Sequence, residues 1–348
     1  MVVEKVADSR FEKVDFENLD FGTVFTDHMM VCRYQNGAWE EPVIKAYQPL
    51  SLHPSASVLH YGQSVFEGMK AYKDKADKVW LFRPEDNFNR INISAKRLQI
   101  PEFPKAHFFD GLLMLLNLDR LWIQPGMGNS LYIRPFVFAS EACVKANEAE
   151  EYTFMIIGAP VKSYYNEPIH VVFAEKYSRA ANGGVGYAKA AGNYAAQFYP
   201  TAEARKQGFQ QIIWTDANAH EYLEEAGTMN IFFRINDTLL TAPVSDRILD
   251  GITRKSIIAL AKKRGIPVEE RPIKVSEIET AAKEGTLKEA FGTGTAVVVL
   301  PIESFSNKGV QYAIPPQENS IANLIKKELT DIQYNEADDP FGWRYAVV

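Results

Sequence analysis

Residues 183–194 read Gly-Gly-Val-Gly-Tyr-Ala-Lys-Ala-Ala-Gly-Asn-Tyr and form the most unusual stretch of the chain. Lys189 is the only charged residue between Arg179 and Glu203, and its neighbours are glycines and alanines. Small neighbours allow a flat, bulky ligand to approach the backbone. A lysine that is kept from water loses its proton more readily and becomes an amine nucleophile. The stretch therefore indicates either a reactive lysine beside a ligand or a flexible surface loop with a solvated lysine.

The sequence before this stretch predicts strands interrupted by two helices. Asn36-Gly37 separates two β-rich runs and predicts a hairpin, because both turn positions need a positive φ. Pro84 and the acids after it predict the start of a helix that ends before Pro101. Asp110 predicts the cap of a second helix that runs toward Ile123. The strands expected here are 25–35, 38–47, 79–82, 131–139 and 153–158.

Two prolines, Pro160 and Pro168, mark the expected boundary between two domains. We expect a small N-terminal α+β domain at 1–160, a linker at 161–168 and a larger C-terminal domain at 169–348. Beyond the linker, the expected strands are 169–173, 211–216, 222–235 and 238–241, and the expected helices are 193–207 and 252–264. Both halves mix antiparallel strands with flanking helices, which predicts an α+β fold and not a doubly wound α/β fold.

Composition excludes several classes of protein. The 348 residues carry a net charge of −6, which argues against a nucleic-acid binder. No apolar run approaches the roughly 20 residues that a membrane span needs. The two cysteines, Cys32 and Cys143, cannot build a disulfide framework or a cysteine-rich metal site, so no metal is expected. We expect a cytoplasmic protein.

Three further features are suited to phosphate binding. Residues 291–296, Phe-Gly-Thr-Gly-Thr-Ala, could present backbone N–H groups and hydroxyls to an anion. Residues 250–254, Asp-Gly-Ile-Thr-Arg, begin an expected helix, whose first N–H groups attract anions. Arg83 follows an expected strand and precedes a proline, which could aim its guanidinium at a phosphate. An ordinary turn, an ordinary helix start and a surface salt bridge are the alternatives.

Two adjacent acids, Glu224 and Glu225, lie on an expected strand. Successive side chains of a strand point to opposite faces, so one acid can be buried while the other is solvated. A buried carboxylate is what a pyridine nitrogen needs if it is to stay protonated. The pattern leaves open which of the two is buried.

Taken in order, these motifs resemble the branched-chain aminotransferases of pyridoxal-phosphate (PLP) fold type IV. The resemblance covers almost the whole chain, since further matching motifs lie at 21–29, 59–72, 81–84, 132–135 and 225–230. It implies the two-domain fold type IV shared with D-amino-acid aminotransferases, with PLP bound by the domain at 169–348. It also implies a homodimer.

The resemblance implies a role for each matching residue. Lys189 is expected to be the catalytic Schiff-base lysine and proton shuttle, Glu225 the partner of the pyridine nitrogen, and Tyr194 a donor to the ring hydroxyl. The expected phosphate-binding residues are Arg83, Ile252, Thr253 and Thr295, with Ile252 and Thr253 acting through backbone N–H groups. Thr228 and Ala296 match the positions that receive the substrate carboxylate. The expected side-chain pocket consists of Phe21, Tyr61, Phe66, Tyr132 and Arg134, with Tyr61 and Phe66 near the dimer interface.

The implied activity is reversible amino transfer between L-leucine, L-isoleucine or L-valine and 2-oxoglutarate, through a Lys189 Schiff base and pyridoxamine phosphate. The partners are therefore small amino acids and 2-oxo acids. A D-amino-acid aminotransferase and an aminodeoxychorismate lyase share the fold and the lysine, and both remain alternatives. A PLP- or phosphate-binding protein without catalysis would require the loss of the lysine or the carboxylate, and this chain keeps both.

Overall fold

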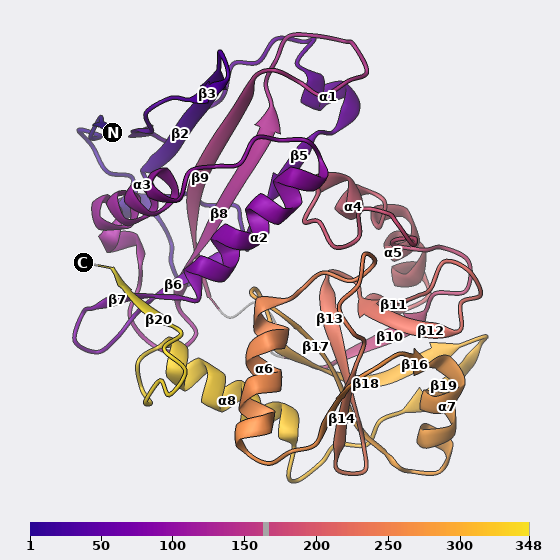
Figure 1. The fold of residues 1–348 in the computed structure, drawn as a ribbon. Coiled ribbons are helices and arrows are strands. Elements are labelled where there is room, and N and C mark those ends of the chain that lie inside the picture. The colour runs from indigo at the N-terminus through magenta and orange to yellow at the C-terminus, as the bar shows by residue number, and fades with distance from the viewer. Residues whose placement is uncertain (163–166, 348) are drawn as a thin grey trace. The chain divides into compact units, whose positions relative to one another are not determined.

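The computed structural model describes residues 1–162 and 167–347, and Figure 1 shows its ribbon. The chain divides into two compact units. The first unit consists of Met1–Tyr164, Ala188–Gly192 and Asp331–Val348, and the second of Tyr165–Tyr187 and Asn193–Thr330. Each unit is built around its own mixed sheet, and each is described by itself below.

The division differs in two places from the expected boundaries. Ala188–Gly192 and Asp331–Val348 pack with the first unit, although they follow the expected linker in sequence. Residues 163–166 of that linker lie outside the described residues. Because tertiary pairing and not chain order places a segment, sequence position alone did not reveal these returns. The assignment of 169–348 as the PLP-binding domain stays a prediction.

The sheet of the first unit has ten strands in the order β1-β4-β2-β9-β8-β6-β7-β20, with β3 paired to β2 and β5 paired to β8. All its strand pairs are antiparallel except β1–β4. The strands are β1 (Val2–Val3), β2 (His28–Gln35), β3 (Ala38–Trp39), β4 (Val43–Ala46), β5 (Ser64–Phe66), β6 (Met69–Lys73), β7 (Val79–Phe82), β8 (Ser130–Ala139), β9 (Tyr152–Val161) and β20 (Arg344–Val347).

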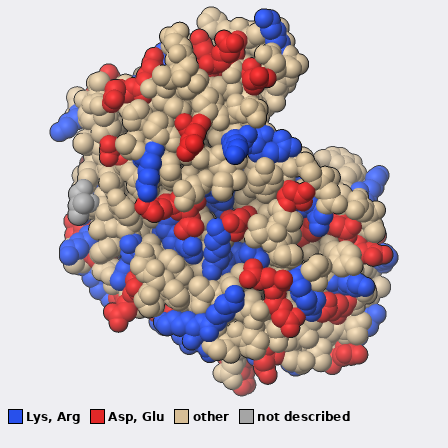
Figure 2. All heavy atoms as spheres, in the orientation of Figure 1, with Lys and Arg blue, Asp and Glu red and all other residues tan. Residues whose placement is uncertain are grey.

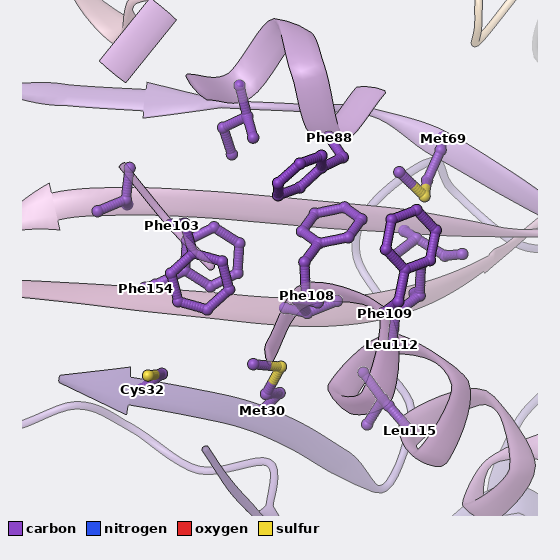
Figure 3. Close-up of a cluster of buried hydrophobic side chains, with 14 of the residues drawn as sticks. Met30, Cys32, Met69, Phe88, Phe103, Phe108, Phe109, Leu112, Leu115 and Phe154 are labelled. Carbon is purple, nitrogen blue, oxygen red and sulfur yellow. The ribbon is translucent and has the colours of Figure 1, made fainter. Parts of the chain in front are cut away.

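Two helices, α2 (Pro84–Arg97) and α3 (Lys105–Leu118), complete the core of this unit. Phe88 of α2 lies 5.3 Å from Phe108 of α3, measured between ring centroids. Figure 3 shows these rings beside Phe103 and Phe154, which stack at 3.6 Å. Burying such aromatic side chains contributes roughly 1.5–3 kcal/mol each. The smaller helices are η1 (Phe11–Lys13), α1 (Ser57–Tyr61) and η2 (Arg120–Trp122).

The start predicted for the second helix was wrong. Asp110 lies inside α3, whose N-cap is Pro104 with an extended backbone. A proline at a helix entrance loses no intrahelical hydrogen bond, because the first N–H groups have no partner within the helix. The helix also ends earlier than expected, and η2 follows it before Ile123.

The second unit holds another ten-stranded sheet, in the order β15-β14-β13-β17-β18-β10-β11-β12-β16, with β19 paired to β18. Most pairs are antiparallel, while β10–β11, β10–β18 and β14–β15 are parallel. The strands are β10 (Ile169–Phe173), β11 (Gln211–Thr215), β12 (Tyr222–Ala226), β13 (Met229–Ile235), β14 (Thr238–Thr241), β15 (Val268–Glu270), β16 (Ile273–Lys274), β17 (Leu287–Gly294), β18 (Val298–Asn307) and β19 (Val310–Ala313).

The helices after residue 190 are α4 (Ala191–Ala195), α5 (Phe198–Lys206), α6 (Ile252–Lys263), α7 (Val275–Lys283) and α8 (Ile321–Gln333). The single helix expected at 193–207 is thus two helices, and Pro200 lies in the first turn of the second one. A proline has no N–H to donate and clashes with the carbonyl four residues earlier, so one continuous helix would be costly here.

Turn chemistry accounts for three of the strand boundaries. Asn36 and Gly37 have φ of 54° and 79°, which confirms the predicted hairpin. The run expected at 38–47 is split into β3 and β4, with Pro42 directly before β4. The run expected at 222–235 is split into β12 and β13 at Gly227, whose φ is 58°. The observed α+β architecture confirms the predicted fold class.

Acidic and basic side chains are intermingled over the face drawn in Figure 2. Within the described ranges, no helix is long and apolar enough to cross a membrane.

Candidate active site

The residues expected to form the site are distributed over both units. Those in the first unit are Phe21, Tyr61, Phe66, Arg83, Tyr132, Arg134 and Lys189. Those in the second unit are Tyr194, Glu225, Thr228, Ile252, Thr253, Thr295 and Ala296.

Lys189 is held against β5 and α2. Its backbone N–H donates to Ser94 Oγ at 2.9 Å, and its carbonyl accepts a hydrogen bond from Phe66 N–H at 3.0 Å. Its Nζ lies 4.9 Å from the centroid of the Phe66 ring. The lysine is half-buried, and its backbone is hydrogen-bonded on both sides.

Four of the five expected pocket residues come together on one face of the first sheet. Tyr132 and Arg134 alternate on β8 and therefore share a face. Arg134 Nη2 donates to the Tyr132 hydroxyl at 3.0 Å, and Arg134 Cζ lies 4.5 Å from the Phe66 ring centroid. Phe21 meets Tyr132 edge-on at 5.1 Å. At Gly68, a Cβ would lie 2.1 Å from the Tyr132 hydroxyl oxygen, so this arrangement requires glycine.

Tyr61, the fifth expected pocket residue, is separate from this cluster. It ends α1, and 45% of its surface is exposed. Its hydroxyl donates to the carbonyl of Val144.

Arg83 is the N-cap of α2 and adopts an unusual backbone conformation. Its φ of 51° is in the left-handed region, which a residue other than glycine rarely enters. Its Nε donates to Asp86 Oδ2 at 2.8 Å, and its guanidinium carbon lies 5.2 Å from the Trp343 ring centroid. Arg83 and Asp86 thus form a salt bridge, and 14% of the Arg83 side chain is exposed.

Glu225 of β12 is a buried carboxylate surrounded by donors. Asn230 Nδ2 and the N–H of Leu249 donate to its Oε1 at 3.0 and 3.2 Å. Arg179 Nη1 lies 2.7 Å from its Oε2. Two hydrogen bonds to Oε1 and the ion pair at Oε2 hold the carboxylate in one orientation.

The expectation that only one of the two adjacent glutamates is buried was wrong. Glu224 and Glu225 are both 3% exposed. They point to opposite faces, as strand geometry requires, but each face is covered and each acid has its own arginine. Glu224 pairs with Arg247. Burial raises the pKa of Glu224, and the hydrogen bond and charge of Arg247 only partly oppose this.

The start of α6 lies close to Glu225 through a shared neighbour, Asn230. Gly251 is the N-cap, and Ile252 and Thr253 follow as the first helical residues. A Cβ at Gly251 would lie 1.8 Å from Asn230 Oδ1, so a larger residue at this helix entrance would have to displace the Asn230 side chain. The first N–H groups of a helix have no intrahelical partner and attract anions.

Asn230 also connects this region to the turn after β17. It is the strand partner of Thr293, whose hydroxyl donates to the Val298 carbonyl at 2.7 Å across that turn. Thr295 and Ala296 lie in the turn itself and are half-buried. The second unit therefore brings together a carboxylate, a helix start and a threonine-containing turn.

Thr228 and Tyr194 also belong to the second unit. Thr228 is exposed in the tight turn between β12 and β13. Tyr194 is half-buried on α4, next to Asn193, whose Nδ2 donates to the Val185 carbonyl at 2.9 Å.

Known proteins match this chain along most of its length. The family model "Amino-transferase class IV" matches residues 64–305. "Branched-chain-amino-acid transaminase 1" of Bacillus subtilis is 43% identical over 344 residues, which cover 97% of this chain and 96% of that relative.

The chain belongs to the class IV aminotransferases.

Solved structures agree with this membership. The branched-chain amino acid aminotransferase from Escherichia coli is 28% identical, has a TM-score of 0.72, and is matched over 91% of this chain and 98% of that one. The branched-chain aminotransferase from Thermoproteus uzoniensis, at 24% identity, has a TM-score of 0.76 over 92% of this chain and 100% of that one and supports the fold. The protein is therefore an aminotransferase of PLP fold type IV.

This class IV aminotransferase uses pyridoxal 5′-phosphate, and its residues fit that cofactor in kind. The first unit offers an amine at Lys189, and the second offers a buried carboxylate at Glu225 and an anion-attracting helix start at Ile252. Among residues 1–162 and 167–347, no group of His, Cys, Asp and Glu side chains is placed to hold a metal ion.

Several residues around these groups were not predicted from the sequence. Arg179 and Asn230 hold the Glu225 carboxylate, and Ser94 holds Lys189. Asn230 lies only five residues after Glu225, within the motif at 225–230, so the sequence itself places it near the expected site. Ser94 is 95 residues from Lys189, and no local pattern could join the two.

Proposed function

We propose that this aminotransferase is a branched-chain-amino-acid transaminase that exchanges amino groups between L-leucine, L-isoleucine or L-valine and 2-oxoglutarate. The cluster of Phe21, Phe66 and Tyr132 around Arg134 carries this proposal. Aromatic rings offer an apolar surface to branched side chains. The printed name of the Bacillus subtilis relative, which is 43% identical, supports the same substrate class.

Arg134 supports the second substrate. Its Nε is buried and has no hydrogen-bond acceptor among the residues that the structure describes. A guanidinium donor in an apolar pocket suits the distal carboxylate of 2-oxoglutarate or glutamate. One pocket then accepts an apolar side chain on its rings and an anionic side chain on its arginine.

Lys189 carries the chemistry in this proposal. When bound, PLP supplies an aldehyde that reacts with amines and a ring that withdraws electrons from the substrate α-carbon. Lys189 Nζ would be the amine that holds the cofactor. The same Nζ would accept the proton from the substrate α-carbon and return it during the transfer.

Glu225 would hold the proton on the pyridine nitrogen. Its carboxylate is kept in one orientation by Arg179, Asn230 and the Leu249 N–H, so it would not need to reorganise during the reaction. Tyr194 would donate to the ring hydroxyl.

The remaining residues hold charged groups of the cofactor and the substrate. The residues that would bind the phosphate are Arg83, Thr295 and, through their backbone N–H groups, Ile252 and Thr253. Thr228 and Ala296 receive the substrate carboxylate. We further propose a cytoplasmic homodimer in which Tyr61 and Phe66 lie near the two-fold interface, which would give the exposed Tyr61 a covering partner.

An amino-donor assay tests the proposed function. The purified protein, loaded with PLP, should transfer amino groups to 2-oxoglutarate from L-leucine, L-isoleucine and L-valine, and D-alanine should be a poor donor. Preference for D-alanine would indicate a D-amino-acid aminotransferase. A lack of transfer from all four donors would contradict the proposal.

A further inference from the structure

Both backbone polar groups of Lys189 are held within the first unit. The N–H donates to Ser94 Oγ at 2.9 Å, and the carbonyl accepts from Phe66 N–H at 3.0 Å. Ser94 lies on α2 with none of its surface exposed, and Phe66 ends β5. An antiparallel bridge between Val65 and Ala190 extends the contact with β5. The backbone of Lys189 is thus hydrogen-bonded to both α2 and β5.

A buried ion pair links the end of β5 to α2, the two elements that hold Lys189. Glu67 directly follows Phe66 and is 0% exposed, and Arg90 lies one helical turn before Ser94 on α2. Arg90 Nε donates to Glu67 Oε1 at 2.7 Å, and Arg90 Nη2 donates to Oε2 at 2.9 Å. Asn87 Nδ2 adds a third hydrogen bond at 2.6 Å. This bidentate ion pair connects the residue that follows β5 to α2, beside Lys189.

The Glu67–Arg90 ion pair also interacts electrostatically with Lys189. Burial raises the pKa of the Glu67 carboxyl, but the charge and hydrogen bond of Arg90, with the charge of Lys189, outweigh burial and hold the pKa below its usual value. Glu67 is therefore ionised at neutral pH, and its negative charge acts on both cations.

We propose that Ser94 is a positioning residue for Lys189 and that the Glu67–Arg90 pair maintains the spacing on which this contact depends. The inference rests on the proposed role of Lys189 as the residue that attaches the cofactor and moves the proton. Both tasks require Nζ to meet reacting atoms closely, and a misplacement of about 1 Å can cost about 100-fold in rate. Removing the Ser94 hydroxyl leaves a buried N–H without its acceptor and favours a shift of the lysine backbone.

Two variants of nearly equal shape isolate the hydroxyl. Ser94→Thr keeps the acceptor oxygen, and Ser94→Val replaces it with a methyl group. Thr153→Ala is the matched control, because it removes a buried hydroxyl of the same unit that bonds to Ser140 Oγ at 3.0 Å. The first readout is hydrogen exchange at the Lys189 amide in the cofactor-free protein. The second is kcat and KM for L-leucine in the PLP-loaded protein, together with its visible absorbance.

Ser94→Val should speed exchange at the Lys189 amide by about tenfold or more, since it removes a hydrogen bond of ordinary strength. It should lower kcat about 10- to 100-fold while KM for L-leucine changes less than about threefold, because geometry at the reacting atoms is lost and substrate binding is kept. Its visible absorbance should also differ from that of the unaltered protein. Ser94→Thr and Thr153→Ala should stay near the unaltered protein in all three measurements.

Equal exchange rates and equal kcat in Ser94→Thr and Ser94→Val would overturn the inference. If the added methyl group prevents both variants from folding, Ser94→Ala compared with Thr153→Ala decides by the same readouts. The exchange measurement needs no cofactor, so it separates the two claims. A Lys189→Ala protein that keeps its turnover would defeat the proposed function, and normal exchange in Ser94→Ala would defeat this inference alone.

Discussion

Replacing Arg134 with methionine tests whether one pocket serves two kinds of substrate side chain. Arg134 lies over the Phe66 ring at 4.5 Å and donates to the Tyr132 hydroxyl at 3.0 Å. Methionine has a similar length and also packs well on aromatic rings, so it keeps much of the apolar contact. It removes every donor of the guanidinium.

The expected magnitude follows from the contact that is lost. A hydrogen bond between a charged donor and a carboxylate contributes about 1.5–3 kcal/mol, so kcat/KM for 2-oxoglutarate should fall about 10- to 150-fold. The side chain of L-leucine has no charge to pair with Arg134. The kcat/KM for L-leucine should therefore change less than about threefold. The loss in kcat/KM should thus be much larger for 2-oxoglutarate than for L-leucine.

The assay follows each half-reaction separately through the visible absorbance of the PLP-loaded protein. Arg134→Lys is the control, because it keeps the positive charge but not the planar two-pronged donor, and it should be intermediate for 2-oxoglutarate. An equal loss for L-leucine and 2-oxoglutarate would mean that Arg134 supports the pocket as a whole. Unchanged kinetics with 2-oxoglutarate would refute the assignment directly.

Three further predictions concern the cofactor, the fold and redox chemistry. Arg83→Ala should weaken PLP binding by about 2–3 kcal/mol through loss of a charge-assisted contact, and excess PLP should restore much of the activity; unchanged PLP retention in dialysis would argue against the assignment. Gly251→Ala should displace Asn230 from two hydrogen bonds, at 3.0 and 2.9 Å, and lower the free energy of unfolding in urea by about 1–3 kcal/mol; an unchanged urea midpoint would show that Asn230 moves aside freely. Activity should be indifferent to mild peroxide and to dithiothreitol, because burial raises the pKa of Cys32 to about 12 and leaves little reactive thiolate, and Cys143 has no partner cysteine nearby in sequence; reversible loss that a serine variant abolishes would reveal a redox site.

Local chemistry made much of the fold predictable from the sequence. The Asn36-Gly37 turn, the helix that begins at Pro84 and the strand β7 all depend on residues close to one another in the chain. The error at Asp110 arose because an acid is a common cap, while the structure begins that helix at Lys105 after a proline. Pro200, in the first turn of α5, is a local signal that divides the helix expected at 193–207.

Side-chain contacts between residues far apart in the sequence could not be predicted from local patterns. The burial of both Glu224 and Glu225 depends on Arg247 and Arg179, which come from distant parts of the chain. The contact between Ser94 and Lys189 spans 95 residues. Motif resemblance located the chemical groups in the chain, but only the tertiary structure reveals the residues that hold them.

The central claim is that Lys189 carries the cofactor and the proton. The most direct measurement compares Lys189→Ala with the unaltered protein, both purified in the presence of PLP, by visible absorbance and by amino transfer from L-leucine to 2-oxoglutarate. The absorbance of the lysine-attached cofactor should disappear and kcat should fall by about three orders of magnitude or more, because nucleophile and proton carrier are lost together. Near-normal turnover in Lys189→Ala would contradict the central claim.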